Sequence, residues 1–167
     1  DTPSKRNFSE HTTIWAVLSG AVTGNAASEL MEKTMNENVA KCSFSMNYYM
    51  FRALEKSGCY KYSEKIMDGW QKMLDMHCTT WCENPDNPRS ECHGWSSAPI
   101  YEMSALRLGV CPDSNGFGSI KIKPVTNGLD WAKGTVPTPH GVISVEWKKS
   151  GGKLIFDAHT PENINMP

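Results

Sequence analysis

The spacing of apolar residues changes once along this chain, near Pro112, and that change constrains the fold more than any other feature. Before Pro112, apolar side chains recur at the period of one face of an α-helix. After it, residues 119–123 alternate between polar and apolar, and residues 142–147 are rich in β-branched side chains, as in strands. Residues 150–152 (SGG) can turn the chain into a further strand at 154–156. The sequence therefore predicts a mainly α chain with an antiparallel β tail.

About five helices are predicted in the α part, over residues 9–24, 26–35, 46–57, 62–74 and 99–109. Ser9 is placed to cap the first helix, because a serine side chain accepts a hydrogen bond from the free N–H groups there. Gly58 is expected to end the third helix, and Pro99 suits the first turn of the last one. These helices can pack as a bundle, but the loop of most interest joins two of them at one end, which indicates a fragment.

The charge balance excludes several classes of partner. The chain has 17 basic and 18 acidic residues, and no basic stripe, so neither nucleic acid nor an anionic membrane is an expected partner. Its longest apolar runs, such as residues 14–18, are too short to span a bilayer. Residues 1–6 do not resemble a signal peptide, so any export signal is expected upstream, and the compartment, cytoplasmic or exported, is left open.

The six cysteines are unevenly spaced, which favours reduced, buried thiols over a disulfide framework. Cys78, Cys82 and Cys92 lie near His77 and His93, and zinc binds thiolates and imidazoles. However, the two-residue gap that is usual within a pair of zinc ligands is missing. No metal site and no cofactor are therefore predicted.

The chemistry is expected in the loop between the last two helices. There TTWCE (residues 79–83) and HGWSS (93–97) flank the proline-rich segment NPDNP (84–88). Prolines fix the backbone and remove donors, so this segment is a loop, and long loops in compact domains are usually functional. A carboxylate, two indoles and an imidazole together suit a neutral polyol such as a sugar.

Each of these residues also has a plain structural interpretation. Glu83 can be a solvated loop acid, or an acid whose pKa is raised by burial beside Trp81, as suits proton transfer. Trp81 and Trp95 can be core residues or flat surfaces for a sugar ring. His93 can be a structural imidazole or a hydrogen-bonding partner of a polyol. Arg89 is interpreted as a loop anchor.

Longer segments carry a family resemblance. The chain contains, in this order, FSEHTTIWAVLSG (8–20), SMNYYMFRALEKSGCY (45–60), TTWCE, RSECHGWSSAPIY (89–101) and GLDWAKGTVPTPHGVISVEW (128–147). Together they resemble the C-terminal part of a bacterial α-L-rhamnosidase. The resemblance implies that residues 1–112 are the closing helices of an (α/α)₆ catalytic barrel. It implies a small antiparallel β-sandwich domain at residues 113–167.

The resemblance also implies roles for the loop residues. Such enzymes remove terminal α-L-rhamnose with inversion, using an acid and a base held about 6.5–9.5 Å apart so that a water fits between them. Glu83 matches the water-activating general base, and His93 matches the pocket histidine that contacts rhamnose. Trp81 and Trp95 correspond to pocket walls. The general acid belongs to an upstream segment and is missing here, so the chain alone is expected to be inactive.

The expected partners are a rhamnose-containing glycan or glycoside and either the upstream part of the same enzyme or a second copy of the chain. A second copy or upstream part would cover apolar faces that include some of Ile14, Trp15, Leu18, Met50 and Leu54. A non-catalytic carbohydrate-binding or structural module of the same fold is the alternative. A helical bundle that contacts other proteins through its exposed faces is a third possibility.

Purified protein is expected to carry no stoichiometric zinc, because its cysteines lack paired ligand spacing and hydrolysis by two carboxylates requires no metal. Elemental analysis after dialysis against a chelator measures this directly. One retained equivalent of zinc would contradict the prediction.

Overall fold

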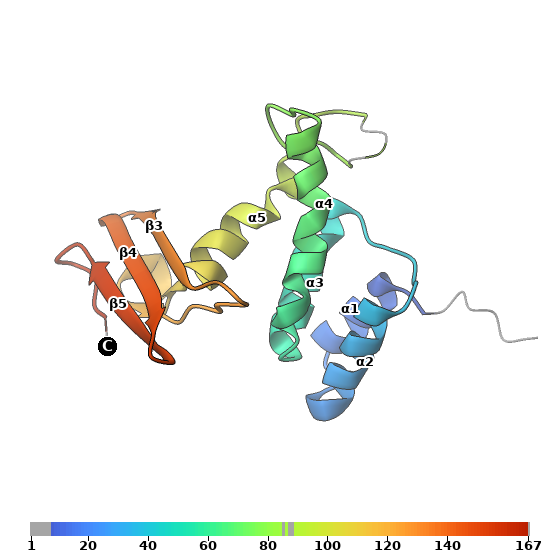
Figure 1. Ribbon diagram of the computed structural model, residues 1–167, viewed down its shortest axis with the longest axis horizontal. Helices are drawn as coiled ribbons and strands as arrows, with labels where there is room; N and C mark the ends of the chain where they lie inside the picture. Colours follow the sequence, from blue (N-terminus) through green and yellow to red (C-terminus); the bar gives the residue numbers. More distant parts are fainter. Residues whose placement is uncertain (1–7, 85, 87–88, 167) are drawn as a thin grey trace, which may run out of the picture. The chain divides into compact units, whose positions relative to one another are not determined.

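The computed structural model describes residues 8–84, 86 and 89–166 (Figure 1). The chain divides into two compact units, Asp1–Ala98 and Pro99–Pro167. The first is helical, and the second combines a short helical segment with two small antiparallel sheets. The predicted combination of helices followed by an antiparallel β tail is therefore confirmed, whereas closure of a barrel remains a prediction.

Four α-helices build the first unit: α1 (Glu10–Leu18), α2 (Gly24–Asn36), α3 (Phe44–Lys56) and α4 (Ser63–Asp75). All four were predicted, but α1 ends earlier than expected. Gly20 adopts a left-handed conformation (φ +82°), and Val22 N–H bonds back to the Ala16 carbonyl at 3.0 Å. This turn ends the helix before Gly24.

The predicted helix ends are present at atomic detail. The Ser9 hydroxyl accepts a hydrogen bond from Thr12 N–H at 3.2 Å, and the Thr12 hydroxyl accepts one from Ser9 N–H at 3.0 Å, which forms a reciprocal capping box. Gly58 (φ +71°) ends α3, where Cys59 N–H bonds to the Leu54 carbonyl at 2.8 Å. This is the left-handed helix end that Gly58 was expected to provide.

The core of the first unit contains most of the residues whose exposure was in question. Ile14, Met50 and Leu54 are 0% exposed, so these three of the five residues need no cover from a second copy or an upstream part, and the expectation of such a partner stays a prediction. Neighbouring helices of the same unit bury them. Leu18 is half-buried, and Trp15 is 45% exposed, so the predicted buried face of α1 does not include this indole.

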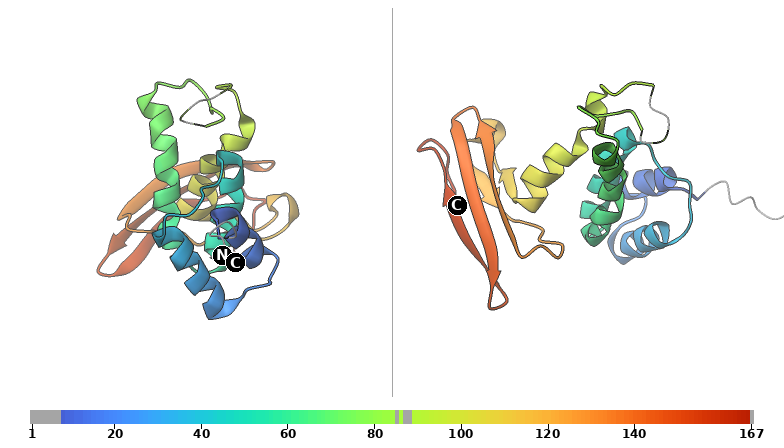
Figure 2. Two further views of the ribbon diagram at one scale, coloured as in Figure 1. Left: turned by 90° about the vertical axis from the view of Figure 1, so that its right-hand side faces the viewer. Right: turned by 45° about the horizontal axis from the view of Figure 1, so that its top comes forward.

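The second unit begins at the second residue of α5 (Ala98–Tyr101), which continues as a π-helical segment, Glu102–Arg107. Strand β1 (Val110–Pro112) pairs antiparallel with β2 (Ile120–Ile122). Strands β3 (Trp131–Thr138), β4 (Gly141–Ser150) and β5 (Lys153–His159) form a second sheet, in which they lie side by side (Figure 2).

Periodicity predicted β2, β4 and β5 but missed β1 and β3. Strand β1 is too short to show a period, and β3 contains Gly134 and Pro137, which both disfavour strands. Strand β3 pairs only with β4, so it is an edge strand, where a proline is tolerated.

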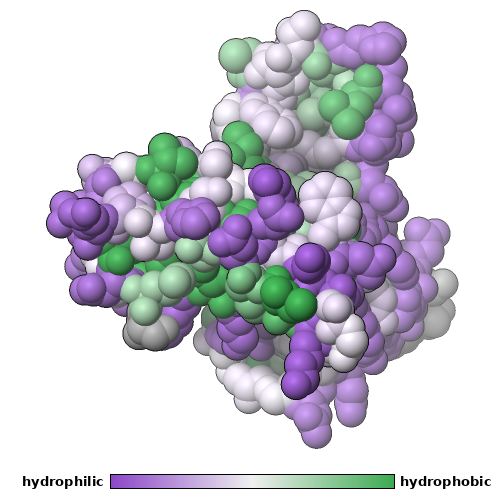
Figure 3. All heavy atoms as spheres, turned by 60° about the vertical axis from the view of Figure 1, so that its left-hand side comes forward, coloured by the Kyte–Doolittle hydropathy of each residue, from purple (hydrophilic) through white to green (hydrophobic). Residues whose placement is uncertain are grey.

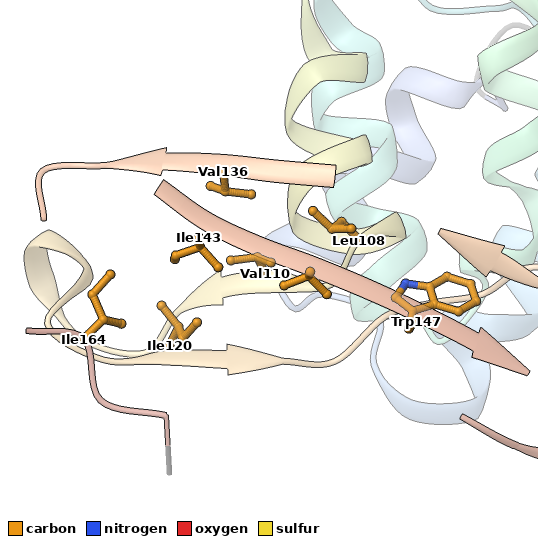
Figure 4. Packing of buried hydrophobic residues seen from close by; sticks show 8 residues of the cluster. Leu108, Val110, Ile120, Val136, Ile143, Trp147 and Ile164 are labelled. Atoms are coloured by element: carbon orange, nitrogen blue, oxygen red, sulfur yellow. The ribbon is translucent and has the colours of Figure 1, made fainter. Parts of the chain in front are cut away.

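A single hydrophobic cluster holds the second unit together (Figure 4). Its buried members are Leu108, Val110, Ile120, Val136, Ile143, Val145, Trp147 and Ile164. The indole Nε1–H of Trp147 also donates to the Arg107 carbonyl at 3.0 Å. Because the end of the helical segment and β1 pack with the strands, the compact unit starts at Pro99, whereas the domain boundary was expected after Pro112.

Exposed apolar side chains occur on both units, and Figure 3 shows hydrophobic side chains interrupting the hydrophilic surface. No helix in the described part of the chain is long and apolar enough to cross a membrane. No disulfide joins the six cysteines, all of which lie among the described residues. Only Cys59 and Cys82 are buried, so the expectation of buried thiols holds for two of the six.

Trp147→Ala is expected to lower the free energy of unfolding of the second unit by about 3–5 kcal/mol, because it removes a fully buried indole from the cluster. Trp131→Ala in the same sheet is the matched control. Trp131 is 65% exposed, so its removal should change stability by about 0.5 kcal/mol or less. Urea titration followed by the amide NMR signals of β3–β5 measures both. Equal effects of the two substitutions would contradict the assignment of Trp147 to the core.

Candidate functional site

The loop that follows α4 begins at an unusual helix end. His77 has a left-handed backbone (φ +56°), and its N–H bonds to the Leu74 carbonyl at 3.0 Å. The next N–H, of Cys78, bonds to the Met73 carbonyl at 2.9 Å. This is the hydrogen-bond pattern that normally favours glycine, here made by a histidine. It sends the chain sharply away from α4 toward Glu83.

Two backbone hydrogen bonds then bring the two predicted segments together. His93 N–H donates to the Trp81 carbonyl at 2.7 Å, and Glu83 N–H donates to the Ser90 carbonyl at 3.0 Å. The returning segment is fixed to α4, because the indole Nε1–H of Trp70 donates to the Ser96 carbonyl at 2.7 Å. Cys82 is 0% exposed and anchors the outgoing segment. The loop thus holds Glu83 and His93 on two backbone segments that are hydrogen-bonded to each other.

The Glu83 side chain is only 16% exposed and is bound by Arg89. Arg89 Nε lies 3.0 Å from Oε1 and 2.8 Å from Oε2, a second guanidinium nitrogen contacts Oε1, and Arg89 N–H lies 3.2 Å from Oε2. The hydrogen bonds from the Arg89 side chain are the largest cause that lowers the pKa of Glu83, to about 2. Partial burial acts in the opposite direction but is outweighed.

Of the two alternatives for Glu83, the one in which burial raises its pKa is therefore wrong. It considered burial beside Trp81 and interpreted Arg89 only as a loop anchor, whereas hydrogen bonds from a guanidinium favour the ionised carboxylate. Arg89 is the site residue that the sequence interpretation missed. The sequence signal that could have identified Arg89 was its position six residues after Glu83, directly beyond the proline-rich segment.

His93 lies beside the same carboxylate. Its Nε2 is 4.0 Å from Glu83 Oε1, and its side chain is 17% exposed. The His93 and Trp95 rings are 4.9 Å apart at an angle of 49°, and Trp95 is 59% exposed. Within the described residues, buried His93 Nδ1 has no hydrogen-bond partner. A carboxylate, an imidazole and an accessible indole thus form one cluster.

The other predicted loop residues are placed differently. Trp81 is half-buried and contributes its backbone carbonyl to the loop, so its role as a pocket wall stays a prediction. Asp86 is exposed and pairs with Lys72 at 3.2 Å, and Glu91 is exposed. No group of three or more histidine, cysteine or acidic side chains that could hold a metal occurs among the residues described.

Comparisons with known proteins support the resemblance to α-L-rhamnosidases that the sequence motifs indicate. Residues 109–167 match the bacterial alpha-L-rhamnosidase C-terminal domain family. The fold is similar to that of a GH78 family rhamnosidase of Bacillus sp. GL1, at 31% identity and a TM-score of 0.83 over 95% of this chain and 18% of that chain. The resemblance to the C-terminal part of an α-L-rhamnosidase is confirmed.

More distant rhamnosidases share the fold. An α-L-rhamnosidase from Aspergillus terreus is 19% identical, with a TM-score of 0.80 over 98% of this chain and 22% of that one. A Streptomyces avermitilis α-L-rhamnosidase complexed with L-rhamnose is 15% identical, with a TM-score of 0.76 over 94% of this chain and 17% of that one. The chain therefore spans about a fifth of the length of these rhamnosidases. No curated protein matches it.

Arg89→Gln is expected to raise the pKa of Glu83 from about 2 toward its ordinary value of 4.5, because the cation that favours the carboxylate is lost. Carboxyl-carbon NMR titration of Glu83 measures this. Lys72→Gln is the matched control, since Lys72 pairs with Asp86 in the same loop and not with Glu83. A pKa that stays near 2 in Arg89→Gln would show that another group holds the carboxylate ionised.

Proposed function

We propose that this chain is the C-terminal part of an inverting glycoside hydrolase that removes terminal α-L-rhamnose from glycans or glycosides. The observation that carries the proposal is the cluster of Glu83, His93 and Trp95. It lies in a chain that is 31% identical over 95% of its length to a Bacillus rhamnosidase. The proposed closing helices of an (α/α)₆ barrel fit the same comparison.

In this proposal Glu83 is the general base. A pKa of about 2 keeps it ionised at neutral pH, which is the state that can accept a proton from water. The water oxygen attacks the anomeric carbon, Glu83 takes the water proton, and the bond to the leaving oxygen breaks. A carboxylic acid on the opposite side of the sugar donates a proton to that oxygen. We assign this acid to an upstream segment of the enzyme.

The neighbours of Glu83 would bind the sugar. Trp95 is 59% exposed, so its flat face is accessible to the C–H face of a pyranose ring. His93 Nε2 lies near the carboxylate and can hydrogen-bond a sugar hydroxyl beside the reacting centre. Trp81 would close the pocket from the outgoing segment. No metal ion or cofactor is needed by this mechanism.

A non-catalytic carbohydrate-binding module is the second candidate. The hydrogen bonds from Arg89 to Glu83 favour it, because a carboxylate with a pKa of about 2 is a weak base. In such a module Glu83 would serve only to orient His93 and the loop. The two candidates differ in whether substitution of Glu83 affects turnover or only sugar binding.

Glu83→Gln is expected to reduce kcat by at least about 10²-fold with a much smaller change in KM, because a general base acts in the chemical step. The assay uses an aryl α-L-rhamnoside and enzyme that carries its upstream part. Glu91→Gln is the control, since Glu91 is an exposed acid of the same loop. Near wild-type turnover of Glu83→Gln would remove Glu83 from the mechanism.

The sugar-binding roles are tested without turnover. Trp95→Ala and His93→Ala are each expected to weaken L-rhamnose binding by about tenfold or more, because each removes a ring contact or hydrogen bond to the sugar. Calorimetry with free L-rhamnose measures binding alone, because the free sugar has no glycosidic bond to break. Trp131→Ala, which removes an exposed indole of the other unit, should leave the affinity unchanged. Equal effects of Trp95→Ala and Trp131→Ala would contradict the assigned site.

A further inference from the structure

Arg89 donates hydrogen bonds to most of the acceptor positions of the Glu83 carboxylate. A carboxylate has about four acceptor positions, two on each oxygen. Oε1 accepts from Arg89 Nε and from a second guanidinium nitrogen, and Oε2 accepts from Arg89 Nε and from Arg89 N–H. With the guanidinium in this place, three N–H groups of Arg89, one of them shared between both oxygens, occupy most of the acceptor positions to which a water or a sugar hydroxyl would donate.

We propose that Arg89 is a displaceable cover on Glu83, which a neutral sugar removes when its hydroxyls take over the carboxylate. The proposal rests on the proposed function of Glu83 and adds a regulatory step to it. Arg89 is thus neither a permanent part of the base nor a mere loop anchor.

The two partners of this ion pair differ in how firmly they are held. The Glu83 side chain is 16% exposed, and its backbone N–H is bound to the Ser90 carbonyl. The Arg89 side chain is 80% exposed, and within the described part of the chain every side-chain hydrogen bond that it donates goes to Glu83. Because the guanidinium is exposed to solvent, salt screens its attraction to the carboxylate. The guanidinium can therefore move while the carboxylate stays in place.

Displacement would change the chemistry of the site. While covered, Glu83 is ionised, but Arg89 occupies most of its acceptor positions. Once Arg89 leaves, the pKa of Glu83 returns toward 4.5 and the carboxylate becomes a stronger base, whose acceptor positions that the sugar hydroxyls do not use are open to water. His93 and Trp95 lie beside it and supply contacts that a sugar gains as it displaces the cation. Sugar binding and activation of the base would then be coupled.

The test is a carboxyl-carbon NMR titration of Glu83 in the 167-residue chain, with amide signals reporting that it stays folded. It is repeated at low salt, at about 1 M salt and with saturating L-rhamnose. In the wild type the pKa of Glu83 is expected near 2 at low salt and to rise toward 4.5 under the other two conditions. In Arg89→Ala, the pKa of Glu83 should lie near its ordinary value of 4.5 under all three conditions.

Lys133→Ala is the matched control. It removes an exposed lysine that pairs with Glu146 at 2.8 Å in the other unit, so it lowers the net charge equally and should not alter the titration of Glu83. The same titration also follows the His93 and Trp95 ring signals, which report sugar binding independently of Glu83.

The outcomes separate this proposal from the proposed function. If the pKa of Glu83 in the wild type stays near 2 at about 1 M salt, Arg89 is a fixed partner and the cover is excluded. If L-rhamnose shifts the His93 and Trp95 signals but leaves the Glu83 titration near 2, sugar does not displace Arg89, and the proposal is likewise overturned. If salt raises the pKa of Glu83 but L-rhamnose shifts no ring signal, the guanidinium is displaceable by salt, but both the sugar-binding roles of His93 and Trp95 and the displacement by sugar are overturned.

Discussion

The candidate site depends on one short backbone contact, the hydrogen bond from His93 N–H to the Trp81 carbonyl at 2.7 Å. It joins the outgoing and returning halves of the loop after α4 and thereby sets the distance between the acid and the imidazole. The bond from Trp70 to the Ser96 carbonyl fixes the returning half to a packed helix. Without these contacts, Glu83 and His93 would be two polar residues on a proline-rich loop.

Electrostatics then decide which state of the carboxylate the site holds. Partial burial of Glu83 favours the neutral acid, whereas the guanidinium of Arg89 favours the anion, and the direct hydrogen bonds outweigh the burial. The same ion pair supplies the ionised state that a general base needs and blocks the acceptor positions that the base would use. Because of this conflict, we regard the paired site as one of two states, the other being the state in which Arg89 has left Glu83.

The family match and the candidate site lie in different compact units. The match to the rhamnosidase C-terminal domain family covers residues 109–167, which lie in the second unit, whereas Glu83, His93 and Trp95 lie in the first. The roles of these three residues therefore depend on their own geometry and on the similarity to the Bacillus rhamnosidase, which covers 95% of the chain. Each unit has a hydrophobic core of its own, so substitutions in one can serve as controls for the other.

The sequence by itself determined the elements whose signals are local. Helical periodicity, the Ser9 cap, the Gly58 helix end and the alternation in β4 all depend on residues a few positions apart. The ordered motifs were enough to predict the relationship to rhamnosidases and to single out Glu83, His93 and Trp95. Only the tertiary structure decided that Leu108 packs with the strands, that Trp15 is exposed and that Arg89 holds Glu83. These outcomes depend on which surfaces meet when the chain closes on itself, and the pKa of a carboxylate depends on the atoms that surround it in space.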